Sequence, residues 1–304
     1  MKKKKDGSAQ KGSGMAKKSL VNSFDFTEAK PPKHALSPVV VALSILIVPV
    51  AVSLFGSYVI PSEYGICAQF VAFALVLAMV LFWNARVNGR TKEALGFHVG
   101  GWHSFFPGIS LGVVLTLLAM GLILLCNGFG FEISGTYRVW FVLLLVGGFL
   151  VQSLAEELLF RGYVQNGVLA ATKKPWTAIV VQALLFTLLH SLRPQIDPLA
   201  ILSFFAFGVL FGLLFEYSDS VWFGTGAHFI WYVVPTILFG MHVSGYDAPS
   251  SILISLPQGP DLLSGGSFGL EGSMLTLLIV VSLCAIYVLF IQRIEKSAAK
   301  KKRA

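Results

Sequence analysis

Two adjacent glutamates and an arginine lie in a stretch of this sequence that is otherwise almost wholly apolar. Glu156 and Glu157 are near the end of the segment from Val139 to Phe160, and Arg161 follows it. In a membrane-embedded protein an ionisable group at depth is costly and indicates a functional site by default. On a helix Glu157 and Arg161 are i,i+4 neighbours that can pair, whereas Glu156 points about 100° away. We therefore expect one neutralised and one free carboxylate; the alternative is a purely structural ion-pair network.

Two histidines on later apolar segments extend this candidate site. His190 follows Phe186 by four residues, and His228 precedes Tyr232 by four, so each pair shares one face of a helix. A polar group on an apolar helix faces the interior of a membrane bundle. A lone histidine there is more often a packing residue than a catalyst. Two histidines on different helices, together with the glutamates, favour a catalytic site. We expect Glu156, His190 and His228 to line one cavity.

The segments that carry these residues are long enough to cross a membrane. The chain is 55% hydrophobic and 12% charged, against roughly one quarter charged in a soluble globular protein. We predict an all-α, polytopic membrane protein with about eight transmembrane helices that enclose an intramembrane cavity. A spanning helix needs about 20 apolar residues. Such runs lie at Val39 to Ile60, Ile66 to Trp83, Phe105 to Leu125, Val139 to Phe160, Trp176 to Leu192, Leu199 to Phe215, Val221 to Gly240 and Met274 to Ile291.

Membrane topology explains the net charge of +8 without nucleic acid. Lys and Arg gather before the first apolar run, between the second and third, after the fourth, and after the last, whereas the loop from Met241 to Ser273 contains none. Positive residues favour the cytoplasmic side. We therefore expect a multi-pass protein of the cell membrane with both termini cytoplasmic and this loop external, with Arg138 and Arg193 on the outer side. Membrane lipids are the expected partners of the basic tails.

Composition divides the chain into three parts. Residues 1–37 are rich in Lys, Gly and Ser and predict a disordered basic cytoplasmic tail. Residues 38–292 form the expected transmembrane domain, with the motifs concentrated in residues 150–234. Residues 293–304 are a second basic cytoplasmic tail.

The three motifs, taken in order, resemble those of the CPBP or Abi family of intramembrane proteases. This family groups type II CAAX prenyl proteases with bacteriocin-processing and self-immunity enzymes. It is marked by Glu-Glu-x-x-x-Arg, Phe-x-x-x-His and His-x-x-x-Asn. Here the first motif runs from Glu156 to Arg161, the second ends at His190, and the third begins at His228. The resemblance implies an intramembrane endopeptidase acting on a membrane-anchored, or lipidated, peptide or protein.

The chemistry of such a site can be written with or without a metal. Glu156 would be the general base that activates a water, and His190 and His228 would position that water or stabilise the oxyanion of the scissile carbonyl. One glutamate with two histidines would equally bind Zn²⁺, and the family is often called metalloprotease. The sequence leaves both alternatives open. The supporting residues would be Glu157, Arg161, Phe186 and Tyr232.

Tyr232 departs from the family pattern. It stands where the third motif has Asn, and it offers one hydroxyl donor instead of two amide donors. In the family that Asn is thought to help hold the oxyanion. The substitution is compatible with a slow enzyme or with an enzyme that has a different substrate. The alternative function is a catalytically lapsed membrane scaffold or bacteriocin-immunity protein, and a third possible function is that of a proton-coupled transporter. An enzyme would have a water-accessible cavity joining Glu156, His190 and His228, whereas in a scaffold each would be satisfied separately.

Overall fold

The fold is that of a helical bundle with one short sheet. This computed structural model describes residues 36–61, 64–98, 101–134, 137–193, 196–242 and 250–303, together with residues 32, 34 and 244. The expected basic tail, residues 1–37, lies largely outside them. Within the described residues nearly all regular structure is helical, which confirms the predicted all-α class.

Each predicted apolar run forms a helix. Six helices are long and apolar enough to cross a membrane, and two shorter apolar helices cover Ser37–Val52 and Pro175–Ser191 within the described part of the chain. The count of eight spanning helices is therefore not confirmed. The main helices are α1 (Ser37–Phe55), α2 (Gly65–Phe82), α3 (Phe105–Leu125), α4 (Val139–Glu157), α6 (Pro175–Ser191), α7 (Pro198–Ser218), α8 (Val221–Val233) and α10 (Met274–Arg303); α5 (Asn166–Thr172) and α9 (Asp261–Ser264) are short.

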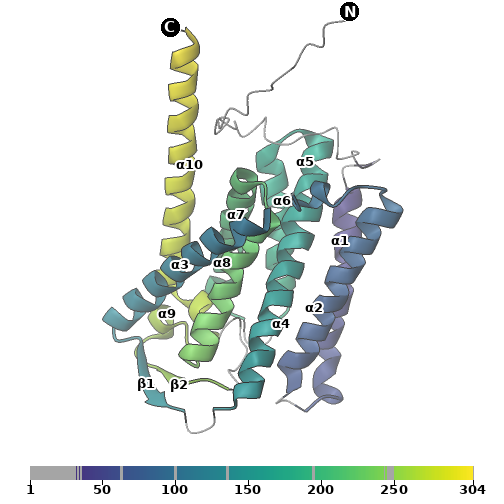
Figure 1. Cartoon of the computed structure of the whole chain (residues 1–304). Coiled ribbons are helices and arrows are strands. Elements are labelled where there is room, and N and C mark those ends of the chain that lie inside the picture. Colours follow the sequence, from purple (N-terminus) through teal and green to yellow (C-terminus); the bar gives the residue numbers. More distant parts are fainter. Residues whose placement is uncertain are drawn as a thin grey trace, which may run out of the picture.

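A two-stranded sheet was not expected from the sequence. Strand β1 (Phe129–Ile133) pairs antiparallel with β2 (Leu253–Pro257), in a register that sets Phe131 opposite Ser255. The sheet joins the segment after α3 to the loop after α8. It lies with α9 at one end of the molecule, and α5 and the far end of α10 lie at the other (Figure 1).

Small residues allow α3 to lie directly against the backbone of α8. A Cβ atom at Gly108 would overlap the carbonyl oxygen of Phe223, and one at Gly112 would lie 2.6 Å from the carbonyl oxygen of Ala227. Small residues permit this close approach of helices in membranes, where lipid gives little hydrophobic drive for association. The contact fixes the part of α8 that carries His228.

The helix that carries the glutamates changes its pitch directly after them. Residues Leu158–Gln165 form a π-helix between α4 and α5, which begins inside the apolar run predicted from Val139 to Phe160. The π-helix packs on the connector between α2 and α3: a Cβ at Gly162 would lie 2.6 Å from the carbonyl oxygen of Leu95, and Asn166 Nδ2 donates to the carbonyl oxygen of Ala94 at 3.0 Å. π-Helical turns are rare and are frequent at functional sites.

Candidate active site

The two adjacent glutamates have the different partners that helical phase predicts. Arg161 Nη1 lies 3.0 Å from Glu157 Oε1, and both side chains are fully buried. Glu156 turns away from this pair, and its Oε1 accepts a hydrogen bond from Gln152 Nε2 at 2.9 Å. Glu157 therefore has a positive partner, whereas Glu156 is held by a neutral amide.

Arg161 lies among aromatic rings. Its guanidinium carbon is 4.7 Å from the ring centroid of Phe186 and 5.2 Å from that of Phe211. Its Nε and Nη2 atoms have no hydrogen-bond partner among the described residues. A cation over a ring face gains roughly 0.5–2 kcal/mol, with the larger values at desolvated sites. The ion pair with Glu157 and these rings together hold the charge, which assigns Phe186 a part in positioning Arg161.

His228 lies between the two glutamates. Its Nδ1 is 3.2 Å from Glu157 Oε1, and its Nε2 is 3.6 Å from Glu156 Oε2. Because a carboxylate accepts hydrogen bonds, we assign the ring proton to Nδ1 and leave Nε2 as an acceptor. The ring is stacked between Phe211, with centroids 5.0 Å apart, and Tyr232, with centroids 4.9 Å apart.

His190 has a similar arrangement. Its Nδ1 is 2.8 Å from the carbonyl oxygen of Phe186, which assigns the ring proton to Nδ1. Its Nε2 has no hydrogen-bond partner among the described residues and lies 3.8 Å from Glu156 Oε2. That carboxylate oxygen likewise has no hydrogen-bond partner there. Two imidazole nitrogens from α6 and α8 therefore face one oxygen of Glu156, each just beyond direct hydrogen-bonding distance.

Tyr232 directs its hydroxyl to the same carboxylate. The hydroxyl oxygen lies 3.1 Å from Gln152 Nε2 and 3.5 Å from Glu156 Oε1. The ring is stacked on Phe149, with centroids 5.2 Å apart and an interplanar angle of 8°. The side chain at the position of the family Asn therefore belongs to the cluster. Gln152, which sequence analysis did not name as a site residue, is four residues before Glu156, and that spacing is the signal for it.

The space beside this cluster is small. A pocket with room for about one water molecule is lined by Phe186, His228, Tyr232 and neighbouring side chains, but not by Glu156 or His190, which are fully buried. A larger apolar cavity of about 210 Å³ lies between α3, α7, α8 and α10. It touches Phe211, whose ring stacks on His228.

Zinc does not fit these side chains as they stand. The donor atoms are of the kind zinc prefers, and each histidine is oriented through its Nδ1. Two ligands at about 2.1 Å in a tetrahedral site are about 3.4 Å apart, and the histidine nitrogens lie only slightly farther than this from the Glu156 oxygen, at 3.6 and 3.8 Å. No group of three or more His, Cys, Asp or Glu in the described part of the chain is arranged to hold a metal ion.

A second buried polar network adjoins the site and was missed by sequence analysis. Glu271, from the loop before α10, accepts hydrogen bonds from Trp231 Nε1 at 2.8 Å and from the backbone N–H of Ser244 at 3.0 Å. Arg193, which the sequence assigned to the outer side, is 7% exposed and donates from Nη1 to the carbonyl oxygen of Ser244 at 2.9 Å. Only the isolated charges of Glu271 and Arg193 hint at this network in the sequence.

Fold and site together define a helical membrane protein with a buried Glu-His-His cluster. A family model described as Type II CAAX prenyl endopeptidase Rce1-like matches residues 138–234, which include every residue of this cluster. The resemblance recognised from the three motifs is thereby confirmed for this segment. At the level of the family, the match supports a CAAX-type intramembrane protease in a multi-pass membrane protein. The search of curated proteins found no match to the chain.

The buried ion pair leads to a prediction about stability. Glu157→Gln leaves Arg161 as an unpaired buried charge, a change that typically costs about 3–5 kcal/mol. We expect a loss of that order in the free energy of unfolding, measured by denaturant titration in detergent. Adding Arg161→Met to this variant should recover much of the loss, because no charge is then left unpaired. Equal stability of wild type and Glu157→Gln would show that the pair does not hold the bundle.

Proposed function

We propose that this protein is an intramembrane endopeptidase in which Glu156 is the general base. The observation that carries the proposal is the unpartnered Oε2 of Glu156, which faces Nε2 of His190 and of His228 at 3.8 and 3.6 Å. Buried polar atoms that lack a protein partner are commonly satisfied by an ordered water, so we place the reacting water beside these three atoms. A water here would donate one hydrogen to Glu156 and the other to one imidazole.

The proposed reaction is hydrolysis by this water. Glu156 takes a proton as the water oxygen attacks the scissile carbonyl, and it later delivers that proton to the leaving amine. His190 and His228 hold the water by accepting its second hydrogen, which agrees with their assigned tautomers. Glu157 and Arg161 do not touch the water in this scheme; Glu157 orients His228, and Arg161 neutralises Glu157.

The proposed substrate is a peptide or protein anchored in the membrane. Glu156 and His228 lie on helices that are long and apolar enough to span a membrane, so a lipidated or membrane-inserted chain is concentrated beside the site. The apolar cavity between α3, α7, α8 and α10 supports this substrate class, because Phe211 and Ala227 in its wall adjoin His228. Membrane lipids are the proposed surroundings of the basic tails.

A second candidate function is a catalytically lapsed membrane scaffold. It is favoured by burial: Glu156 and His190 are fully buried, His228 is 3% exposed, and the neighbouring pocket has room for about one water. Against it stand the unpartnered atoms of Glu156 and His190, because buried polar groups in a purely structural network are normally hydrogen-bonded. Catalysis by this site would require the helices to separate far enough to admit a peptide bond.

The base assignment leads to a prediction about activity. Glu156→Gln keeps the shape of the side chain but cannot take a proton, so we expect cleavage of a membrane-anchored peptide to be abolished. The assay compares wild type and variant in detergent or liposomes, against the same peptide with and without its anchor. The unfolding free energy of the variant should stay close to that of wild type, because Glu156 is in no direct hydrogen-bonded ion pair. Cleavage at the wild-type rate by Glu156→Gln would contradict the assignment.

We also propose that both chain termini face the cytoplasm. Lys173 and Lys174 follow α5, which lies at the end of the molecule opposite the sheet (Figure 1). On a background without Cys67, Cys126 and Cys284, an exposed Ser267→Cys should react with an impermeant maleimide from outside the cell. The matched variant Lys174→Cys should react only from the cytoplasmic side. The reverse pattern would show that the orientation is wrong.

A further inference from the structure

One glutamine side chain contacts both the proposed base and the tyrosine beside it. Gln152 on α4 is 4% exposed, and its Nε2 donates to Glu156 Oε1 at 2.9 Å and to the hydroxyl oxygen of Tyr232 at 3.1 Å. An ionised carboxylate only accepts hydrogen bonds, which assigns the nitrogen of the amide, and not its oxygen, to the end that faces Glu156. That nitrogen donates and does not accept, so the Tyr232 oxygen accepts from it. Both hydrogens of the Gln152 amide are thereby used.

The bond from Gln152 decides where the hydroxyl hydrogen of Tyr232 points. The hydroxyl oxygen is 3.5 Å from Glu156 Oε1, beyond the roughly 2.5–3.0 Å of an ordinary O–H···O bond. The three separations form a narrow triangle, so the amide nitrogen and the carboxylate oxygen lie in similar directions from the hydroxyl oxygen. A hydroxyl accepts and donates in well-separated directions, because its lone pairs and its hydrogen lie on different sides of the oxygen. The bond accepted from Gln152 therefore turns the hydrogen away from Glu156.

The ring of Tyr232 is held in place by stacking. It lies on Phe149 of α4 on one side and on His228 of its own helix on the other, with ring centroids 5.2 and 4.9 Å apart. With the ring fixed, the hydroxyl can change only by rotation about its C–O bond. The hydrogen bond from Gln152 sets that rotation.

The proposed hydrolysis needs a hydrogen-bond donor for the oxyanion. With their ring protons on Nδ1, His190 and His228 present acceptors to the site, so they hold the water and leave the oxyanion to another group. The amide of Gln152 has both hydrogens engaged. Among the described side chains in contact with Glu156, the Tyr232 hydroxyl therefore has the hydrogen that is left to donate.

We propose that Gln152 is a positioning residue that turns the Tyr232 hydroxyl away from Glu156, so that this hydroxyl stabilises the oxyanion. Without the Gln152 amide the hydroxyl would donate to Glu156 Oε1, and its hydrogen would face the base instead of the reacting carbonyl. This inference rests on the proposed function, since it assigns a part in that same reaction. The competing explanation is structural: Gln152 only ties α4 to α8 through its contact with Tyr232.

A double-mutant cycle on kcat separates the two explanations. Removing an oxyanion donor typically lowers kcat about 100- to 1,000-fold, and we expect this for Tyr232→Phe. Gln152→Met keeps the length of the side chain and removes its donor, so kcat should fall about 10-fold, the ratio typical of one neutral hydrogen bond. KM should stay nearly unchanged, because the oxyanion exists only in the transition state. In the Tyr232→Phe background, Gln152→Met should lower kcat less than about 3-fold, because its effect passes through the hydroxyl. Losses that multiply would overturn the proposal.

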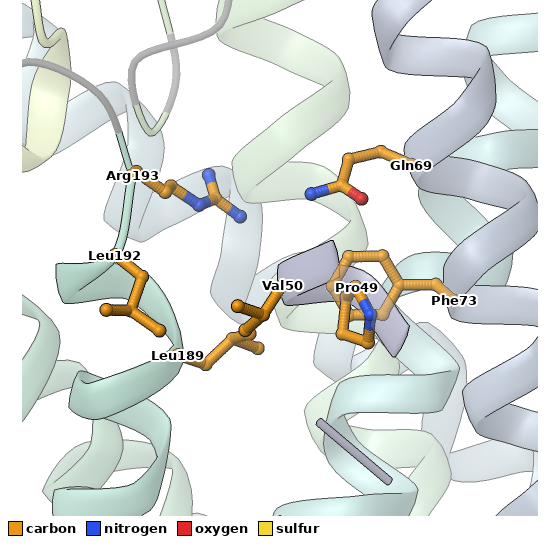
Figure 2. Close-up of a pocket in the computed structure, with 7 residues that line it drawn as sticks. All are labelled: Pro49, Val50, Gln69, Phe73, Leu189, Leu192 and Arg193. Carbon is orange, nitrogen blue, oxygen red and sulfur yellow. The ribbon is translucent and has the colours of Figure 1, made fainter. Parts of the chain in front are cut away.

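Gln69→Met is the matched control. Gln69 is likewise a buried glutamine, 6% exposed, on α2, which packs against α4. Its amide projects into a small pocket that it shares with Arg193, and none of the side chains that line this pocket belongs to the cluster around Glu156 (Figure 2). We expect Gln69→Met to keep the wild-type kcat. An equal loss of kcat in both glutamine variants would overturn the proposal, because the loss of any buried amide would then be sufficient.

A spectroscopic measurement tests the hydroxyl without catalysis. The relative intensities of the tyrosine Raman doublet distinguish a hydroxyl that accepts a hydrogen bond from one that donates. Subtracting the spectrum of Tyr232→Phe from that of wild type isolates Tyr232, and the same subtraction is made in the Gln152→Met background, or in Gln152→Leu if the Met variant folds poorly. We expect an accepting hydroxyl in wild type and a donating one in the variant. The same intensity ratio in both backgrounds would overturn the proposal.

The outcome for wild type and Glu156→Gln is measured in the same cleavage assay. If these two proteins have equal activity, or wild type cleaves nothing, the proposed function fails and the role of Gln152 falls with it. If Glu156→Gln is inactive, wild type is active, and the losses in the cycle multiply, only the role of Gln152 fails. The two failures are therefore distinguishable.

Discussion

The buried ion pair between Glu157 and Arg161 is the interaction on which the site depends. An isolated charge inside this bundle would cost several kcal/mol, so neither side chain can be there without the other. The pair engages the carboxylate of Glu157, one of the two adjacent glutamates. It also leaves Glu157 Oε1 in position to hold His228 at Nδ1. Through that contact the ion pair orients the imidazole of His228 toward Glu156. The two adjacent glutamates therefore have different roles, because their side chains point to different faces of the helix.

Close helix packing brings the other groups to Glu156. Glycines on α3 allow α8 to approach backbone to backbone, which places His228 and Tyr232 against α4. On α8 itself, a Cβ at Gly224 would overlap the Glu157 carboxylate, so only glycine leaves space for it. Aromatic rings fill the remaining volume: Phe186 and Phe204 flank His190, and Phe211 and Tyr232 flank His228. With both rings held on two sides, their nitrogens can point in few other directions.

Much of this site follows from the sequence because its geometry is local. The i,i+4 spacing sets the partner of Glu157, and the same spacing sets the faces that His190 and Tyr232 share with their neighbours. The features that could not be predicted from the sequence depend on tertiary contacts. The π-helix after Glu157 packs, at Gly162, against Leu95 of a connector far away in the chain. Arg193 looked like an outer-loop charge because it follows the end of an apolar run, yet its side chain is buried and donates to the carbonyl oxygen of Ser244.

The most direct test of a single site built on Glu156 is a structure with a bound peptide phosphinate. Its tetrahedral group mimics the hydrated scissile carbonyl, so it should take the place of the water and the developing oxyanion. We expect one phosphinyl oxygen within hydrogen-bonding distance of Glu156 and a histidine Nε2, and the other oxygen at the Tyr232 hydroxyl. A phosphinate bound elsewhere, with Glu156, His190 and His228 arranged as they are without it, would contradict the account.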